Sequence, residues 1–351
     1  MEDLNLKDFL EREEITFENE DDIKIYLQGK VILVTGAGGM LGSEVVRQIC
    51  KFSPKKIILF DICENGVYNL QQELRFKYLN IEIIIEIGSI RDKNRIEEVL
   101  AEHYPTIVFH SAAHKHIPLM ENNPGEAIKN NIIGTYNLAN ACGVRGVKSF
   151  TLFSSEKAVN PNTVMGATKR YSEMIIQYLT LIHKTKYNAV RFGNILGSNG
   201  SVFDVFKKQI LRGGPIMVAN REVSRRFILP SEAAQLALYT AVFAKDGEIF
   251  SLDINEEIKI YDLARNMIKK LSPDKDIEIN EVGLRLGDEP EKRKNSNLNK
   301  TQSNKISVEK QREFGFSIIS KMRGLEFDLN VLSNNFIKQN LFELIEHFEK
   351  M

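Results

Sequence analysis

Three side chains that can exchange protons follow one another at Ser155, Glu156 and Lys157, and a second lysine, Lys169, lies further along the chain. A carboxyl group beside an amine can supply both a general acid and a general base. For Lys157 to act as a base near neutral pH, its pKa must fall to about 7 to 8 through burial or a nearby positive charge. Taken alone, an adjacent Glu-Lys pair is more often an exposed ion pair at a strand end, so the residues by themselves leave both interpretations open.

A glycine-rich segment has the spacing of a loop that binds nucleotide phosphates. An apolar run leads directly into Gly36, Gly39 and Gly42. Such glycines allow a tight turn and a close approach of the backbone to a pyrophosphate, and the following helix N-terminus supplies N–H groups. Asp61 ends the next apolar run 19 residues after Gly42, where a carboxylate binds both ribose hydroxyls and repels a 2′-phosphate. This pattern predicts an NAD site, with NAD favoured over NADP; the alternative is a tight turn without a ligand.

The elements that must position these residues alternate between strand and helix. Continuous apolar runs, as expected of strands buried on both faces, occupy residues 30–35, 56–62, 81–87, 106–110, 149–153 and 187–191. Helical periodicity begins near Ser43, and a second helix with one apolar side is predicted over residues 174–182. This alternation is typical of repeated βα units. We therefore predict an α/β fold, a doubly wound parallel Rossmann-type sheet with a smaller C-terminal substrate-binding lobe.

The predicted domains are an N-terminal acidic extension (1–29), an NAD-binding core that carries the catalytic segment (30–191), and a substrate-binding lobe with returning core elements (192–351). Residues 1–22 hold ten acidic side chains against two basic ones, which favours a solvated leader. Residues 291–305 contain one apolar residue and are predicted to form a loop. Residues 331–348 are amphipathic, which predicts a terminal helix packed on the body.

Composition excludes several classes of protein. The 351 residues carry a formal net charge of zero, so no global field attracts a polyanion and nucleic acid is not an expected partner. The three cysteines lie far apart without metal-ligand spacing, so neither a disulfide framework nor a metal site is predicted. No window approaches the roughly 18 apolar residues that a membrane span needs, and the acidic start is unlike a signal peptide. A cytoplasmic location without a membrane span is expected.

Longer motifs carry a resemblance to a known family. The GxxGxxG spacing, HSAAHKH at residues 110–116 and NNIIGT at residues 130–135 resemble the extended short-chain dehydrogenase/reductases. In that superfamily a tyrosine stands four residues before the lysine that corresponds to Lys169, but this chain has Met165 there. The segment SSEKAVNPNTVMGATK is similar to the STDKAVNPxxxMGATK pattern of bacterial UDP-N-acetylglucosamine 4,6-dehydratases of capsule and O-antigen biosynthesis. The likeness extends over nearly the whole chain.

The resemblance implies a reaction and a role for each catalytic candidate. NAD⁺ takes a hydride from C4 of the sugar, water is eliminated across C5 and C6, and the hydride returns to C6. Glu156 would protonate the leaving O6, Lys157 would remove the C5 proton, Ser155 would hydrogen-bond the C4 oxygen, and Lys169 would hold the nicotinamide ribose. The family has Asp where this chain has Glu156. The added methylene moves the carboxyl group by about one ångström, a shift that can cost about 10²-fold in rate.

The same resemblance implies the binding residues. The cofactor contacts would be Gly36, Gly39, Met40, Leu41, Gly42, Asp61, Ser89, Ile90, Ser111, Ala112, Ala113, Lys115, Asn131 and Lys169. The substrate contacts would be Met165, Asn194, Ser201, Val202, Arg225, Arg285 and Asp288. His114 and His116, beside Lys115, are interpreted as neighbours of the cofactor. The family's GLRPGEK is GLRLGDE here, which reverses one charge at Glu289 near the expected phosphate.

The leading hypothesis is an NAD-dependent nucleotide-sugar 4,6-dehydratase, acting on UDP-N-acetylglucosamine or a close relative and assembling as a homo-oligomer. A nucleotide-sugar 4-epimerase of the same fold is an alternative, disfavoured because Met165 replaces the tyrosine. A catalytically impaired protein that only binds NAD or a nucleotide sugar is another, suggested by Glu156 and the altered GLRLGDE segment.

Overall fold

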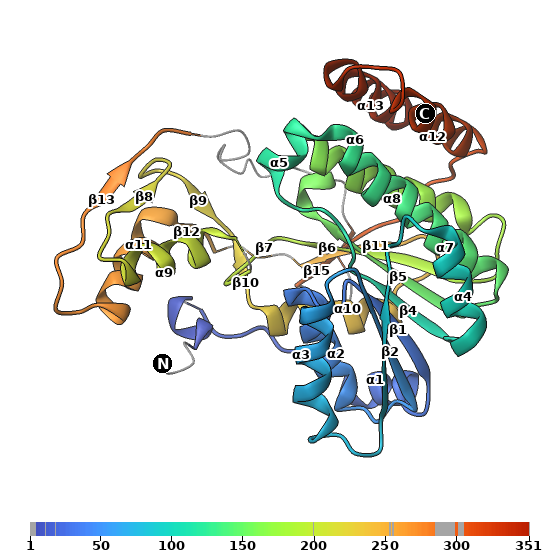
Figure 1. Cartoon of the computed structure of the whole chain (residues 1–351), viewed down its shortest axis with the longest axis horizontal. Coiled ribbons are helices and arrows are strands. Elements are labelled where there is room, and N and C mark those ends of the chain that lie inside the picture. Colours follow the sequence, from blue (N-terminus) through green and yellow to red (C-terminus); the bar gives the residue numbers. More distant parts are fainter. Residues whose placement is uncertain are drawn as a thin grey trace.

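A nine-stranded sheet with the order β14-β15-β11-β6-β5-β4-β1-β2-β3 forms the centre of the molecule (Figure 1). The structure is a computed structural model that describes residues 5–10, 12–17, 19–198, 200–252, 254, 256–284, 299–300 and 305–350. Seven neighbouring strands, from β3 to β11, are parallel. The chain changes winding direction between β1 and β4, and open α/β sheets bind ligands outside the carboxyl ends of the strands at such a point. The predicted doubly wound parallel fold is confirmed.

The predicted apolar runs coincide with the first six strands. The strands of the large sheet are β1 (Val31–Thr35), β2 (Lys56–Asp61), β3 (Glu82–Ile87), β4 (Ile107–His110), β5 (Ser149–Ser155), β6 (Lys186–Phe192), β11 (Ile249–Leu252), β14 (Asn299–Lys300) and β15 (Ile306–Glu309). The last two are antiparallel to their neighbours. The loop predicted over residues 291–305 is therefore wrong at Asn299 and Lys300, because strand pairing uses backbone groups that composition does not reveal. The other described residue of that segment, Lys305, directly precedes β15.

Helices cover both faces of the sheet, and alternate residues of the strands point into the two layers. In β1, Leu33 belongs to one apolar cluster, while Ile32 and Val34 belong to the other. The first layer contains α4 (Lys93–His103), α5 (Ile117–Asn122), α6 (Pro124–Ala127), the π-helical η2 (Ile128–Gly134), α7 (Thr135–Val144), α8 (Val164–Leu179), α12 (Ser317–Asp328) and α13 (Asn334–Glu349). The second contains α1 (Glu20–Leu27), α2 (Met40–Cys50), α3 (Glu64–Arg75) and α10 (Pro230–Phe243).

Two predicted helices differ from the observed ones. Helix α2 begins at Met40 rather than near Ser43, because Gly39 already adopts the extended backbone of an N-cap and Gly42 lies inside the first turn. Helix α8 begins at Val164, ten residues before the predicted start, and all of its residues are buried rather than those of one side. The reason is that β5, β6, α7 and α13 all pack against it (Figure 1). The predicted terminal helix corresponds to α13.

A smaller lobe has an apolar cluster of its own, built around Phe203, Phe206 and Leu263. Its elements are η1 (Leu6–Phe9), β7 (Asn194–Ile195), α9 (Val202–Leu211), β8 (Ile216–Val218), β9 (Ser224–Arg225), β10 (Phe227–Ile228), β12 (Ile258–Lys259), α11 (Ile260–Leu271) and β13 (Ile279–Glu281). In Figure 1 most of this lobe lies to the left of the large sheet. The domain boundaries given above stay a prediction.

The described N-terminal residues are not a solvated leader. Phe9 is buried in the small lobe against Phe203, with ring centroids 5.0 Å apart, and Leu27 is buried in the core of the large sheet. Between them, Arg12 donates hydrogen bonds to both carboxylate oxygens of Glu232, which is fully buried in α10. The prediction weighed acidic charge and missed the apolar residues spaced among the charges.

Candidate active site

The glycine loop follows β1 and folds tightly onto itself. Gly36 has a φ of +68°, and a Cβ there would lie 2.6 Å from the backbone nitrogen of Ala112. A Cβ on Gly42 would lie 2.1 Å from the carbonyl oxygen of Gly36. Gly39 is the N-cap of helix α2, and none of the described side chains caps its first N–H groups. The loop and the uncapped helix end therefore form a cradle of backbone donors that suits a phosphate.

Asp61, at the carboxyl end of β2, is fixed beside this cradle. One carboxylate oxygen accepts the N–H of Gly38 at 2.8 Å, and the other accepts the N–H of Cys63 at 2.9 Å. Each oxygen keeps a second lone pair that can accept a hydroxyl. The structure thus brings Asp61 and the glycine loop together, in the arrangement that would hold the ribose of a dinucleotide.

The remaining cofactor candidates follow β3 and β4 at the same edge of the sheet. Ser89 and Ile90 come after β3, and Ser111, Ala112, Ala113 and Lys115 come after β4. Asn131 is buried in η2 and holds the second of these loops: its amide accepts from the N–H of His114 at 2.8 Å and donates to the carbonyl of His114 at 3.0 Å. It also donates to Thr168 of α8 at 3.0 Å. Asn131 therefore positions the loop, and its predicted contact with a cofactor stays a prediction.

The catalytic candidates meet at the carboxyl end of β5. Ser155 ends the strand, and Glu156 and Lys157 form the short turn η3 (Glu156–Ala158) that precedes α8. The hydroxyl of Ser155 accepts the backbone N–H of Lys157 at 3.2 Å. The Glu156 carboxylate lies beside Gly193, since a Cβ built there would be 3.5 Å from Glu156 Oε1. The turn thus lies where the large sheet passes into the small lobe.

Helix α8 packs directly against this turn. A Cβ on Gly166 would lie 2.4 Å from the carbonyl oxygen of Lys157, so the absence of a side chain lets the first turn of α8 approach η3. Lys169 is buried one turn later, and its Nζ donates to the carbonyl of Phe153 in β5 at 2.9 Å. Burial lowers the pKa of Lys169 to about 8, and the carboxylate of Glu173 opposes that shift. Lys169 can therefore gain or lose a proton near neutral pH.

Two positions in α8 determine whether a tyrosine hydroxyl lies near the carboxyl end of β5. Met165 is buried in the first turn of α8, at the position where the superfamily has its tyrosine. Tyr171 is fully buried, donates its hydroxyl to the carbonyl of Ile318 at 2.7 Å and packs on Phe348 of α13. Tyr171, the next tyrosine along α8, therefore lies on the side of the helix that faces α12 and α13, away from β5.

Sequence analysis missed His110, which connects β1, β4 and α7. Its Nδ1 lies 2.7 Å from the hydroxyl of Thr35, and its Nε2 lies 2.9 Å from the hydroxyl of Thr135. Burial, reinforced by the charge of Lys169, lowers the pKa of His110 to about 3, so the ring stays neutral. The signal in the sequence that could have indicated this residue is that a histidine ends the buried run of β4.

The substrate candidates lie on the small lobe. Asn194 begins β7 and donates to the carbonyl of Arg226 at 3.3 Å, and Arg225 is buried in β9 and donates to the carbonyl of Ser224 at 2.9 Å. Ser201 occupies the N-cap position of α9 without a side-chain capping bond, Val202 is the first residue of the helix, and the buried hydroxyl of Ser201 has no partner among the described residues. Arg285 and Asp288, together with Glu289, lie outside the described residues.

His116 is placed differently from the prediction. The sequence predicts a neighbour of the cofactor, but the ring of His116 lies against the loop before α9, where a Cβ on Gly200 would be 2.8 Å from His116 Cε1. The interpretation used only the distance along the chain from β4. In the fold, the loop after β4 turns toward the small lobe, so His116 faces the substrate candidates.

Comparison with known proteins defines the class. Residues 32–312 match the model of the polysaccharide biosynthesis protein family, and the chain belongs to that family. It is 41% identical over 357 residues to the probable polysaccharide biosynthesis protein EpsC of Bacillus subtilis, covering 99% of this chain and 58% of that protein. It is 46% identical over 323 residues to the capsular polysaccharide biosynthesis protein CapD of Staphylococcus aureus, covering 91% and 53%. The chain spans little more than half the length of these two relatives.

More distant relatives have narrower names. A UDP-N-acetylglucosamine 4,6-dehydratase (inverting) of Campylobacter jejuni is 32% identical over 249 residues, covering 70% of this chain and 72% of that protein. Among solved structures, Pen from Bacillus thuringiensis has a TM-score of 0.68 at 34% identity, covering 74% of this chain and 81% of that one. DesIV, a dTDP-glucose 4,6-dehydratase of Streptomyces venezuelae solved with NAD and TYD, has a TM-score of 0.66 at 18% identity, covering 73% and 85%, and shows the fold alone.

Two further observations on the described residues concern membrane spans and metal binding. Among the described residues, no helix combines the length and the apolar character that crossing a bilayer requires. Glu86, Glu102 and His103 bring possible metal-ligand atoms within 4.8 Å of one another, but Glu86 is already bound by Arg95 and His103. This cluster gives no support for a metal role.

Proposed function

We propose that the chain is an NAD-dependent nucleotide-sugar 4,6-dehydratase that converts UDP-N-acetylglucosamine, or a close relative, into a 4-keto-6-deoxy sugar. The observation that carries the proposal is the combination at the end of β5. Ser155, Glu156 and Lys157 supply an acid and a base there, while Met165 replaces the superfamily's tyrosine and Tyr171 is held by Ile318 and Phe348 on the side of α8 away from β5. One of the relatives is named a UDP-N-acetylglucosamine 4,6-dehydratase (inverting), which also supports the proposal.

The residues of the cradle fit an NAD molecule. Gly36 and Gly42 lie where any side chain would fill the loop, and the first turn of α2 offers N–H groups to a pyrophosphate. Asp61 would accept the adenosine ribose hydroxyls, and its negative charge disfavours a 2′-phosphate. When bound, NAD⁺ supplies an acceptor for the C4 hydride and later returns that hydride to C6. DesIV, a neighbour in fold, was solved with NAD.

The protein's own residues carry the elimination. Once C4 is a ketone, the C5 proton becomes acidic, and Lys157 accepts it; when the hydride adds to C6, Lys157 returns a proton to C5, by then exchanged with solvent. Glu156 donates a proton to the C6 hydroxyl, so that the C6–O bond breaks and one water leaves. Ser155 would donate a hydrogen bond to the C4 oxygen, and Lys169 would bind the nicotinamide ribose and add positive potential. Glu156 and Lys157 are neighbours in η3, so an acid for the C6 oxygen and a base for C5 come from the same turn.

The nucleotide would occupy the small lobe. Ser201 at the start of α9 and the guanidinium of Arg225 would hold the diphosphate, since helix N-termini and arginine forks both bind phosphate oxygens. The unpartnered hydroxyl of Ser201 among the described residues supports this role. Asn194, Val202 and Met165 would shape the sugar pocket. Assembly as a homo-oligomer and a location in the cytoplasm stay predictions.

The test is mass spectrometry of UDP-N-acetylglucosamine incubated with the protein and NAD⁺ in D₂O. The expected product has lost one water and carries deuterium at C5. A product of unchanged mass with an inverted C4 would instead establish the 4-epimerase. Thermal stabilisation by NAD⁺ and by the UDP-sugar, without any product, would establish a binding protein in which Glu156 fails to replace the family's aspartate.

A further inference from the structure

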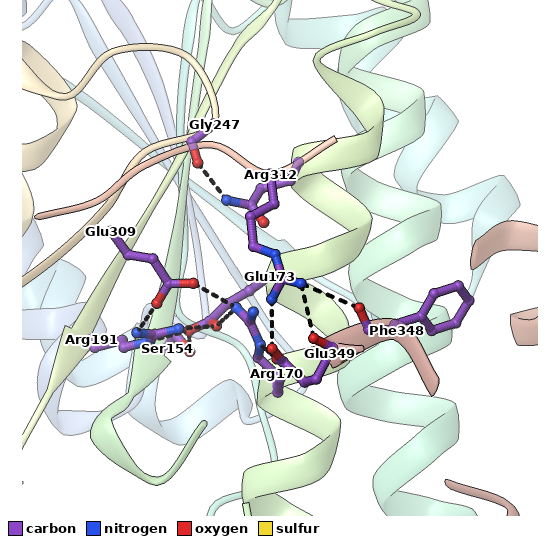
Figure 2. Close-up of polar contacts among 10 residues, drawn as sticks. Ser154, Arg170, Glu173, Arg191, Gly247, Glu309, Arg312, Phe348 and Glu349 are labelled. Atoms are coloured by element: carbon purple, nitrogen blue, oxygen red, sulfur yellow. Dashed lines mark hydrogen bonds and ion pairs between the residues drawn. The ribbon is translucent and has the colours of Figure 1, made fainter. Parts of the chain in front are cut away.

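Directly behind the catalytic turn lies a group of charged side chains that the proposed reaction does not use; its centre is buried and its outer members are partly exposed. This Glu173 cluster consists of Ser154, Arg170, Glu173, Arg191, Glu309, Arg312 and Glu349 (Figure 2). Its members come from β5, α8, β6, β15, the segment after β15 and the end of α13. Three arginines face three glutamates, so the cluster is electrically balanced.

Glu173 is the central residue of the cluster and is fully buried. One of its carboxylate oxygens accepts from Ser154 Oγ at 2.6 Å and from Arg191 Nε at 2.8 Å. The other accepts from Arg191 at 2.7 Å and from Arg170 at 3.1 Å. Burial alone would raise the pKa of Glu173, but the two arginines more than offset it, and the pKa lies below its usual value. Glu173 is therefore an anion with every hydrogen bond satisfied.

The bond to Ser154 joins this cluster to the catalytic segment. Ser154 directly precedes Ser155, the first of the catalytic candidates. Lys169 and Glu173 lie one turn apart on α8 and hold two successive residues of β5, through the carbonyl of Phe153 and the hydroxyl of Ser154. The strand end that carries Ser155, Glu156 and Lys157 is thus fixed by side chains of α8 as well as by its neighbouring strands.

The far side of the cluster reaches the end of the last helix. Arg170 Nε donates to Glu349 in the last turn of α13, and Arg312 binds the other carboxylate oxygen of Glu349 at 2.5 Å. A continuous chain of contacts therefore runs from Glu349 through Arg170 and Glu173 to Ser154 (Figure 2). A buried ion pair alone is weak evidence for stability, because apolar residues can replace it at little cost. The hydrogen bond from Ser154 connects the Glu173 cluster to the strand that carries the catalytic candidates.

We propose that Glu173 is a positioning residue for the reaction: through Ser154 it fixes the end of β5 that presents the catalytic turn, and through Arg170 and Glu349 it makes that position depend on α13. The inference rests on the proposed function. Displacement of a reacting group by about one ångström can cost about 10²-fold in rate, so a small relaxation of this strand end has a measurable effect.

The first test removes only the hydroxyl that Glu173 holds. Ser154→Ala keeps both arginines paired, Ser154→Thr restores a hydroxyl, and Ser149→Ala makes the same change at the other end of β5. Deuterium exchange of backbone amides is measured by mass spectrometry in the peptide that spans residues 155–158. We expect faster exchange in Ser154→Ala, exchange closer to wild type in Ser154→Thr, and no change in this peptide for Ser149→Ala.

The second measurement is steady-state kinetics of the same variants. Ser154→Ala should lower kcat about tenfold with KM within about twofold, because binding groups stay in place while the reacting groups move. Glu349→Gln should accelerate exchange in residues 155–158 as well, since it weakens the hold of Arg170 from the α13 side. Glu173→Gln should shift the alkaline limb of activity to lower pH, because the carboxylate that supports the charge of Lys169 is lost.

The outcomes separate this inference from the proposed function. Unchanged exchange in both Ser154→Ala and Glu349→Gln, or wild-type kcat in Ser154→Ala of an active enzyme, overturns the positioning role. If the wild-type protein forms no dehydrated product, the proposed function fails, while the exchange measurement still decides whether the cluster fixes the strand end. If Glu173→Gln does not fold, Ser154→Ala carries the test alone.

Discussion

The cofactor cradle and the catalytic turn lie at the same edge of the sheet but are built in different ways. The cradle consists mainly of backbone: two glycines without room for a Cβ, an uncapped helix end and one carboxylate that also binds two N–H groups. The catalytic turn consists of side chains, and side chains of α8 support it from behind. In the proposed enzyme, backbone would fix where the cofactor lies and side chains would determine which reaction follows, so mutations in the two regions should affect different measurements.

The largest effect should come from Lys157→Met. Loss of a general base typically costs 10²- to 10⁴-fold, and we expect deuterium incorporation at C5 to fall by about 10³-fold. NAD⁺ affinity, measured by calorimetry, should stay within about twofold, because the cradle is untouched. Lys148→Met, which changes an exposed lysine just before β5, is the matched control. Full exchange in the Lys157 variant would remove this residue from the role of base.

Gly42→Ala tests the cofactor cradle, the other of the two regions compared. The new Cβ would lie 2.1 Å from a backbone oxygen, so the loop must move. Overpacking of this kind costs about 1–3 kcal/mol, which corresponds to roughly a 5- to 150-fold loss of NAD⁺ affinity if the strain falls on the bound loop. Gly324→Ala in α12, where the Cβ meets no atom within 4 Å, should leave the affinity unchanged. An unchanged affinity in Gly42→Ala would show that the cradle is less rigid than its contacts indicate.

The smallest predicted effect lies where the two regions meet, at Lys169. Its pKa is lowered to about 8, so the side chain is charged below that pH and loses its proton as the pH rises through it. If its positive charge assists the reaction, kcat/KM should fall about tenfold for each pH unit above that value. Lys169→Arg should abolish this alkaline limb, because a guanidinium stays protonated. An identical limb in both proteins would assign the titration to another group.

The sequence predicted the cradle better than the surroundings of the catalytic turn. Gly36 and Asp61 are close in sequence, and the strand and helix between them follow ordinary periodicity. The Glu173 cluster joins residues as distant as Ser154 and Glu349, and along the chain Arg170 and Glu173 look like an exposed pair on one side of a helix. Only the packing of α13 over α8 turns that pair into a buried connection. His116 was misplaced for the same reason, since the loop that it faces belongs to a distant segment.

The N-terminal residues have a consequence for the order in which the molecule assembles during synthesis. Phe9 packs against Phe203, and Arg12 pairs with Glu232, so these early residues must wait for about two hundred more before their partners exist. Until then Phe9 has no partner to pack against. A shortened chain that starts after residue 17 would leave that aromatic position empty and Glu232 buried without Arg12. Such a chain would expose apolar core residues of the small lobe, Phe203 among them.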